Sequence, residues 1–100
     1  MNELVWFYPQ GHEAHQERGH PERPERVEVI RKAMEQAGWW DSYSKLDPVT
    51  VPEHVLTRIH SPEYLNLLEM TSRRGGHLDA DTYVTSASWQ LAHVAAGGGV

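Results

Sequence analysis

One short run of apolar residues limits what this chain can fold into. Residues 3–8, ELVWFY, are rich in aromatic and branched side chains and end at Pro9, which predicts a buried strand. A second strand is predicted over residues 45–51, although Pro48 weakens it as a central strand. Two strands do not make a sheet that is stable by itself, and a buried parallel strand needs neighbours on both sides. We therefore expect an α/β chain whose 100 residues are the amino-terminal part of a larger domain. A compact helical bundle with a docked hairpin is the alternative.

The first predicted helix follows a polar, proline-containing stretch. Pro24 suits the first helical position, where a missing N–H costs no hydrogen bond, and Gly38 is a natural stop. Apolar residues recur between them at helical spacing: Val27, Ile30, Met34 and Ala37. A shorter helix is predicted over residues 52–59.

Another helix has strong signals at both ends. Ser61, Pro62 and Glu63 provide an N-cap, a proline at the first position and an acid in the first turn. Arginines and Gly75 close it, with cations where the helix dipole favours them. Its predicted buried side consists of Tyr64, Leu65, Leu67, Leu68 and Met70.

Two polar segments, residues 9–23 and 76–85, are predicted to be loops. Loops as long as the first are often functional. Ser86 or Ser88 is expected to cap a last helix, and the glycines at 97–99 are expected to mark close helix packing.

Composition excludes several classes of protein. No cysteine is present, so neither a disulfide framework nor a thiolate site is possible. The net charge of -5 argues against a nucleic-acid surface, which needs a basic stripe. The apolar run at residues 4–8 is too short for a signal-peptide core or a membrane span. We expect a soluble, cytoplasmic protein that binds neither membranes nor nucleic acid directly.

The first loop carries several side chains that bind metals in other proteins. His12 and His15 form an H-x-x-H pair, with Glu13, Glu17 and His20 close by, and such a set could bind zinc. The spacing is permissive on a loop, and zinc sites usually show tighter ligand pairs. Solvated loop histidines are therefore the favoured interpretation. The sequence also has no G-x-S-x-G elbow and no phosphate-binding loop.

Three charged residues allow more than one interpretation. Arg26 could point inward and hold a carboxylate with its guanidinium, but periodicity favours an exposed arginine paired with nearby glutamates. Asp79 and Asp81 could accept hydrogen bonds from the amides of a ligand or could cap a turn. Spacing does not decide between these roles.

Taken in order, several blocks resemble a known family. GHPERPERV, a helix ending in AGWW, RIHSPEYLNLLE, DADTYV and a helix closing in AAGGG resemble the amino-terminal part of the histone deacetylase superfamily. The likeness is to its bacterial deacetylase and acetylpolyamine amidohydrolase branch. It implies a domain several times longer than this chain, built on an open, mostly parallel sheet flanked by helices. It also implies zinc-dependent removal of acetyl groups from acetyl-lysine proteins or acetylpolyamines.

The resemblance also implies roles for individual residues. His20 and Pro21 match the family's His-Pro pair in a loop at the rim of the active-site entrance. Arg26 matches an arginine that reaches an internal cavity through which acetate leaves, which reverses the exposed interpretation given above. Asp81, or alternatively Asp79, matches the loop aspartate that holds the amides of the substrate.

The family's catalytic residues are not among the matched blocks. Its histidine pair, zinc ligands and catalytic tyrosine follow the matched segment, so the resemblance gives His12 and His15 no zinc-binding role. We expect the isolated chain to be inactive. A truncated, non-catalytic family member and a small metal-binding module using His12, His15 and His20 are the alternatives. The sequence predicts neither the particular acetylated substrate nor the oligomeric state.

Overall fold

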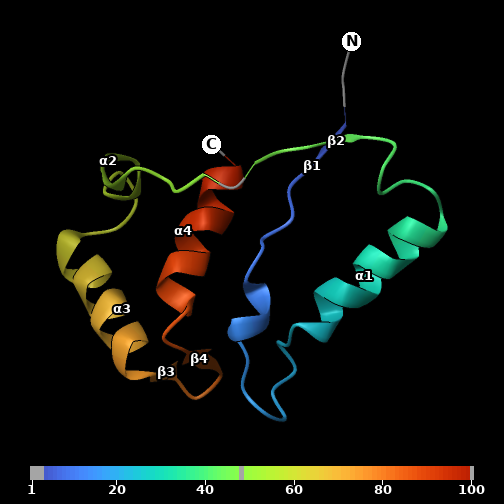
Figure 1. Cartoon of the computed structure of the whole chain (residues 1–100). Coiled ribbons are helices and arrows are strands. Elements are labelled where there is room, and N and C mark those ends of the chain that lie inside the picture. Colours follow the sequence, from blue (N-terminus) through green and yellow to red (C-terminus); the bar gives the residue numbers. More distant parts are fainter. Residues whose placement is uncertain (1–3, 48, 100) are drawn as a thin grey trace.

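The computed structural model describes residues 4–47 and 49–99. Figure 1 shows helix α4 between α3 on one side and the segment from β1 to η1 on the other, with α1 beyond that segment. Glu3 and Pro48, which the predicted strands included, lie outside the described residues. In chain order the elements are β1 (Val5–Trp6), η1 (His12–Ala14), α1 (Glu25–Gln36), β2 (Ser44–Lys45), α2 (Glu53–Leu56), α3 (Pro62–Arg74), β3 (Gly76–Asp79), β4 (Thr82–Val84) and α4 (Ser88–Gly98).

Strands β1 and β2 pair in parallel, as the α/β prediction requires. Val5 lies opposite Ser44, and the N–H of Leu46 donates to the carbonyl of Trp6 at 2.8 Å. The prediction of a strand over 45–51 is wrong for most of its length, because β2 ends at Lys45. Further along, the N–H of Val51 donates to the carbonyl of His93 at 3.3 Å, so this part of the chain lies against α4 instead of extending the sheet.

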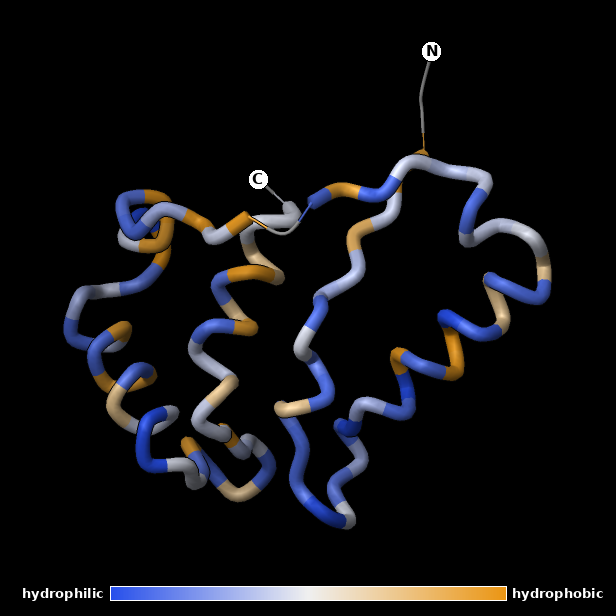
Figure 2. The backbone as a smooth tube through the Cα atoms, viewed as in Figure 1, coloured by the Kyte–Doolittle hydropathy of each residue, from blue (hydrophilic) through white to orange (hydrophobic). Residues whose placement is uncertain are grey.

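Helix α1 has the predicted bounds but no buried face. It follows Pro24 and stops before Gly38, which has a φ of +78° that favours glycine. No described residue of α1 is buried, and 65% of Val29 and 61% of Ile30 are exposed. Figure 2 shows apolar and hydrophilic positions interleaved along the whole helix. Of the predicted apolar face, Val27 and Met34 are half-buried, whereas Ile30 and Ala37 are exposed, so the described part of the chain covers this face only in part.

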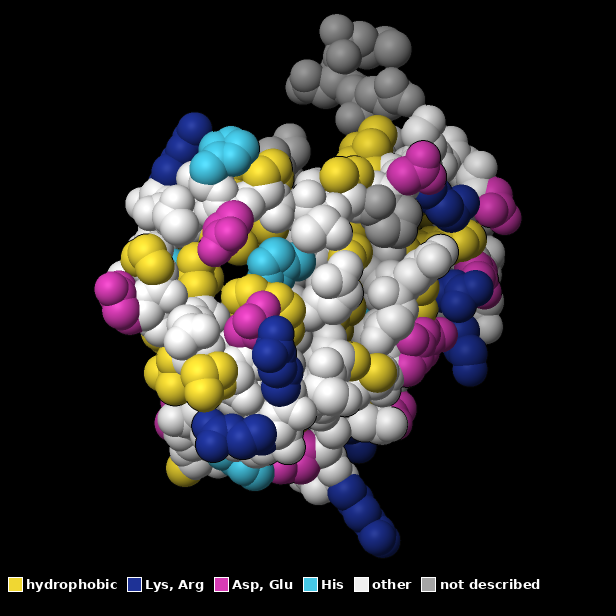
Figure 3. Space-filling model, turned by 60° about the vertical axis from the view of Figure 1, so that its left-hand side comes forward, with side chains coloured by type: hydrophobic (Ala, Val, Ile, Leu, Met, Phe, Trp, Pro, Cys, Tyr) yellow, Lys and Arg dark blue, Asp and Glu magenta, His cyan; other side chains and the backbone are white. Residues whose placement is uncertain are grey.

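Helix α3 is capped as predicted. The Oγ of Ser61 accepts a hydrogen bond from the N–H of Tyr64 at 3.2 Å, and Gly75 ends the helix with a φ of +73°. The predicted buried side is largely wrong. Leu65 is buried, but Leu67 is half exposed. On the face that brings α2 and α3 forward, hydrophobic side chains reach the surface between charged ones (Figure 3). The other exposed members of the predicted set are Tyr64 and Met70.

The predicted loop at 76–85 is wrong, because these residues form an antiparallel hairpin. In β3 and β4, Gly76 lies opposite Val84 and His77 opposite Tyr83, with an irregularity in the register before Asp79. Only Tyr83 is fully buried, while the polar residues around it face solvent. The hairpin is therefore held by one inward side chain on a mostly polar segment.

The start of helix α4 is capped by another helix. Neither Ser86 nor Ser88 caps it, since its N-cap is Ala87 and no side chain of the N-cap contributes. Instead, the Oγ of Ser72 in α3 accepts from the N–H of Trp89 at 3.0 Å and donates to the carbonyl of Thr85 at 2.6 Å. One buried hydroxyl thus joins α3, the end of β4 and α4.

Replacing Ser72 with alanine is expected to lower the free energy of unfolding by about 1–3 kcal/mol. The change leaves the part-buried N–H of Trp89 without its hydroxyl acceptor, and such a group loses its hydrogen bond at the cost of desolvation. The carbonyl of Thr85 loses one of two donors, since it still accepts from the N–H of Ser88 at 3.0 Å. Urea denaturation measures the loss. Ser86→Ala is the matched control, because Ser86 is exposed, and equal stability of the two variants would contradict the role of Ser72.

The glycines at the end of α4 pack closely, as predicted. A Cβ placed on Gly97 would overlap the carbonyl oxygen of Val49, and one placed on Gly98 would lie 2.5 Å from Cδ1 of Phe7. Gly99 has more room, with its nearest neighbouring atom 3.6 Å away. Two adjacent glycines thus allow the backbone before α2 and the ring of Phe7, which follows β1, to approach α4.

The described residues form a thin layer around a small core. The principal extents are 43 × 35 × 17 Å, and the radius of gyration is 15.4 Å, against about 13 Å for a compact domain of this length. The buried hydrophobic side chains among the described residues are Val51, Leu65 and Tyr83. A search of the described helices finds none with the length and apolar character needed to cross a bilayer.

Candidate functional site

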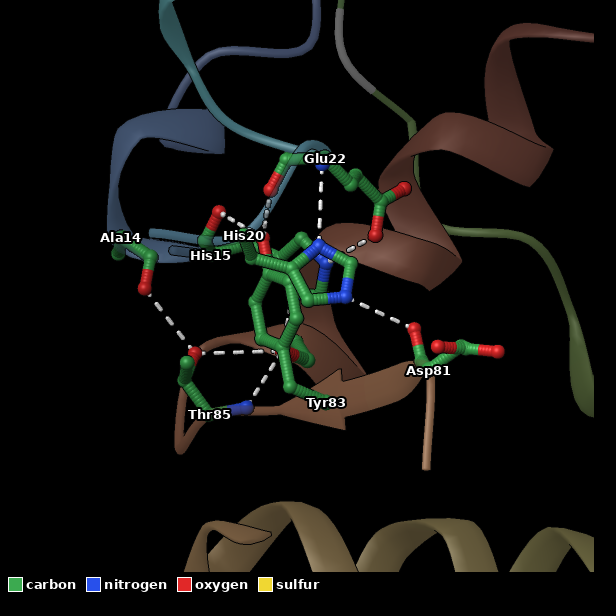
Figure 4. Close-up of polar contacts among 8 residues, drawn as sticks. Ala14, His15, His20, Glu22, Asp81, Tyr83 and Thr85 are labelled. Atoms are coloured by element: carbon green, nitrogen blue, oxygen red, sulfur yellow. Dashed lines mark hydrogen bonds and ion pairs between the residues drawn. The ribbon is translucent and has the colours of Figure 1, made fainter. Parts of the chain in front are cut away.

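Tyr83 joins the first loop to the hairpin. Only 2% of it is exposed, and its hydroxyl donates to the carbonyl of Glu22 at 2.8 Å and lies 3.1 Å from the carbonyl of His15. Its ring stacks on His15, with centroids 4.4 Å apart, and meets the ring of His20 edge-on at 4.7 Å. Burial, followed by the nearby carboxylates, raises the pKa of the phenol. These residues and their neighbours form a group that we call the rim cluster (Figure 4). Its members are His15, His20, Glu22, Asp81, Tyr83, Thr85 and Ser88.

His20 spans the rim cluster with both ring nitrogens. Its Nδ1 lies 3.0 Å from the N–H of Glu22 and its Nε2 lies 2.9 Å from the carbonyl of Asp81. An amide can only donate and a carbonyl can only accept, so Nδ1 is unprotonated and Nε2 carries the proton. The ring is therefore neutral, with a single tautomer assigned by its two partners. Pro21, which the resemblance paired with His20, is exposed beside it.

The two aspartates of the hairpin turn have different roles. The carboxylate of Asp79 accepts from the N–H of Asp81 at 2.9 Å, and this hydrogen bond lowers the pKa of Asp79. The carboxylate of Asp81 is exposed and makes no hydrogen bond to any other described residue. Asp79 thus shapes the turn, and the carboxylate of Asp81 is available to a ligand.

A second histidine closes the inner side of the rim cluster. The Nδ1 of His15 lies 2.6 Å from Oγ of Ser88 and its Nε2 lies 3.3 Å from Oε2 of Glu22. Ser88 Oγ also accepts from the N–H of Thr85 at 2.7 Å, and Thr85 Oγ1 donates to the carbonyl of Ala14 at 3.0 Å. These contacts join the first loop to the start of α4.

His12 belongs to a separate cluster beneath the loop. It is buried, and its Nε2 lies 2.9 Å from the hydroxyl of Tyr8 and 3.1 Å from Oε1 of Glu28. The hydroxyl of Tyr8 donates to the same carboxylate oxygen. The guanidinium of Arg31 lies 3.6 Å from Glu28 and 5.4 Å from the ring centroid of Tyr8. This network fastens the first loop to α1.

The pKa of Glu28 provides a test of this network. Hydrogen bonds, first from Tyr8 and then from His12, lower the pKa of Glu28. A carboxylate with a lowered folded-state pKa stabilises the fold above its unfolded pKa, and this contribution disappears as the pH falls through the folded pKa. We expect Tyr8→Phe to raise the pKa of Glu28 toward its usual value and to weaken the acid dependence of stability. Carbon-13 NMR of the Glu28 carboxyl measures its pKa in the wild-type protein and in Tyr8→Phe. An unchanged pKa in the variant would contradict the assigned hydrogen bond. Tyr43→Phe, at an exposed tyrosine, is the control.

The described residues do not fit a zinc site. Among them, the ligand atoms that lie together belong to His12, Glu13 and Glu28. Glu28 already accepts from Tyr8 and His12 and lies beside the positive charge of Arg31, so this donor set is occupied by its own hydrogen bonds. The module of three histidines is also not formed. His15 binds Ser88 and Glu22, while His20 binds Asp81 and Glu22.

Arg26 lies on the exposed surface of α1. Together with His12, His15, Glu22 and Ile30 it lines a hollow of about 190 Å³ between the first loop and α1. The described residues thus neither bury its guanidinium nor close a cavity around it. Its predicted role in a product cavity stays a prediction.

Several residues of the site were missed in the sequence. No role in the site was predicted for Tyr83, Ser88 or Glu28. Ser88 was predicted only as a helix cap, Tyr83 only as part of the DADTYV block, and Glu28 is one of several glutamates near α1. The strand-forming residues Thr82, Tyr83 and Val84 in succession were the available signal for a strand. Nothing local distinguished Glu28.

The fold and the rim cluster define a class of protein: an α/β domain with a parallel strand pair and an exposed aspartate, Asp81, on a hairpin turn that a loop histidine contacts. The family follows from comparison. The model of the histone deacetylase domain matches residues 20–100, and the chain belongs to this family. The predicted resemblance to the histone deacetylase superfamily is confirmed, and its bacterial deacetylase and acetylpolyamine amidohydrolase branch stays a prediction.

Known relatives agree with this assignment. The chain is 32% identical over 83 residues to a probable deacetylase of Archaeoglobus fulgidus, covering 81% of this chain and 23% of the relative. It is 29% identical over 96 residues to a probable deacetylase of Methanothermobacter thermautotrophicus, covering 95% and 28%. The crystal structure of the HDA15 HD domain superimposes with a TM-score of 0.86 at 25% identity, covering 94% of this chain and 29% of that one. The chain thus spans about a quarter of the length of these proteins.

Proposed function

We propose that these residues are the amino-terminal portion of a single deacetylase domain that removes acetyl groups from acetyl-lysine proteins or acetylpolyamines. The observation that carries this proposal is the family match over residues 20–100. The thin layer and the exposed apolar residues Val29 and Ile30 of α1 support an incomplete domain, because parallel sheets are normally covered on both faces. The cytoplasmic location stays a prediction.

Within that domain, the described residues build part of the substrate entrance. The carboxylate of Asp81 accepts N–H groups of the substrate, while Asp79 holds the turn that presents it. His20 and Pro21 form the adjoining wall, and Arg26 is assigned to the product side. The chemistry supplied by a bound zinc ion is Lewis acidity toward the acetamide and water. Its ligands are proposed to lie outside residues 1–100, as the resemblance implies.

The test uses the full-length protein and the isolated chain side by side. The full-length protein is expected to release acetate from an acetyl-lysine peptide or an acetylpolyamine and to lose this activity when zinc is chelated. The isolated 100 residues are expected to be inactive. Asp81→Asn is expected to raise KM about tenfold, since it weakens a hydrogen bond to a charged group. Asp47→Asn, at another exposed aspartate, is the control. Undiminished turnover after chelation, or activity of the isolated chain, would refute the proposal.

A further inference from the structure

The backbone on both sides of the Asp81 side chain is held by other side chains. Its N–H donates to the carboxylate of Asp79 at 2.9 Å, and its carbonyl accepts from Nε2 of His20 at 2.9 Å. The carboxylate itself makes no hydrogen bond to the rest of the described chain. Asp81 therefore has a fixed backbone and a carboxylate with no partner among the described residues. Such a residue is preorganised for a ligand, because its backbone loses little conformational entropy on binding.

The backbone and the ring of His20 are both held in place. Its N–H donates to the carbonyl of Glu17 at 3.0 Å, and Pro21 after it favours an extended backbone at His20. The ring is bounded edge-on by Tyr83, and its Nδ1 accepts from the N–H of Glu22 at 3.0 Å. The only remaining donor, Nε2–H, points at the carbonyl of Asp81 across a separation of 61 residues. Figure 4 shows the imidazole between Glu22 and Asp81.

We propose that His20 is a positioning residue, which acts through Asp81 by fixing its peptide in the substrate entrance. This inference rests on the proposed function for its consequence in binding, but the contact itself can be tested without substrate. In this proposal the histidine of the His-Pro pair holds Asp81 in position and does not itself contact the ligand. The neutral ring uses its acceptor to hold its own loop and its donor to hold the hairpin turn.

Two substitutions at His20 separate these two hydrogen bonds. In His20→Asn, the side-chain oxygen can accept from the N–H two residues later, as in an Asx-turn, but the shorter side chain cannot reach Asp81. In His20→Gln, the longer side chain places an amide N–H near the position of Nε2. The asparagine variant is therefore expected to keep the loop and lose the contact with the turn, whereas the glutamine variant restores that contact.

The first measurement is nitrogen-15 NMR of the histidines in the full-length protein, without substrate, at about pH 8. His20 is expected to show an unprotonated Nδ1, a protonated Nε2 and a scalar coupling from Nε2 to the carbonyl carbon of Asp81. Amide exchange at Asp81 and Thr82 is expected to accelerate in His20→Asn and to return toward wild type in His20→Gln. A protonated Nδ1, or unchanged exchange in His20→Asn, would overturn the proposal.

The second measurement is steady-state kinetics of the full-length protein. His20→Asn is expected to raise KM about fivefold with little change in kcat, and His20→Gln to recover most of the loss. If Asp81→Ala raises KM but His20→Asn does not, the positioning role fails and the proposed function stands. If Asp81→Ala leaves KM unchanged, the substrate role of Asp81 falls and the positioning role falls with it.

Discussion

Replacing Gly97 with alanine is expected to cost at least about 3 kcal/mol of folding free energy, the upper end of the range for overpacked cores. The added methyl group would overlap the carbonyl oxygen of Val49 and come within 3.3 Å of the N–H of Val51. Both neighbours are backbone atoms, so no side-chain rotation can relieve the overlap. The N–H of Val51 is also bound to the carbonyl of His93, which ties this segment to α4. Helix and segment must therefore separate.

The neighbouring glycines provide matched controls for this prediction. Gly98→Ala meets the ring of Phe7, a side chain that can rotate, so its cost is expected to be smaller. Gly99→Ala meets nothing closer than 3.6 Å and is expected to be neutral. Denaturant unfolding of the three variants should rank them in this order. Equal effects at Gly97 and Gly99 would show that α4 does not pack closely on Val49 in solution.

Replacing Tyr83 with alanine is expected to cost about 3–5 kcal/mol, the range for deleting a buried aromatic side chain. The change empties the centre of the rim cluster, since the ring packs on both His15 and His20. It also removes the donor to the carbonyls of His15 and Glu22. The hairpin and the first loop are expected to lose their contact together.

Tyr83→Phe separates the hydroxyl from the ring. This variant keeps the packing and loses only the donor, so about 1–3 kcal/mol is expected. Tyr64→Ala is the control for loss of a tyrosine at an exposed position of α3. Thermal or urea unfolding gives the three values. If Tyr83→Ala were no worse than Tyr64→Ala, Tyr83 would not anchor the loop in solution.

Local signals predicted the helices well. The cap at Ser61 and the stops at Gly38 and Gly75 need only a few neighbouring residues, and the structure confirms all three. The close packing of Gly97 and Gly98 was also predicted correctly, because a run of glycines in an apolar helix has few other physical reasons. Each of these features depends on a few residues that are adjacent in the sequence.

Features that depend on distant residues were predicted poorly. Ser72 caps a helix that begins sixteen positions after it (88 − 72 = 16), so no window around Ser72 could reveal this role. The hairpin was predicted to be a loop because its burial depends on a single residue, Tyr83. The apolar faces of α1 and α3 were predicted correctly as apolar but wrongly as buried. Periodicity identifies such a face, whereas burial requires a partner.

In the candidate site, too, local sequence patterns predicted less than contacts between distant residues reveal. His20 and Asp81 were chosen through the family resemblance, and the structure brings them into contact. Spacing alone left Asp79 and Asp81 equivalent, and the hydrogen bond from the amide of Asp81 separates them. The three loop histidines were grouped by proximity in sequence, but the structure separates them into two clusters. His12 binds Tyr8 and Glu28, whereas His15 and His20 both contact Glu22 and Tyr83.

The long separations within the rim cluster have a consequence for synthesis on the ribosome. His15 leaves the exit tunnel 68 residues ahead of Tyr83, and His20 leaves it 61 residues ahead of Asp81. The contacts of Ser72 with Thr85 and Trp89, by contrast, close over 13 and 17 residues. Shorter loops cost less entropy to close and form sooner. The unit formed by α3, the hairpin and α4 is therefore expected to fold first. The first loop, although synthesised earlier, is expected to dock onto this unit afterwards.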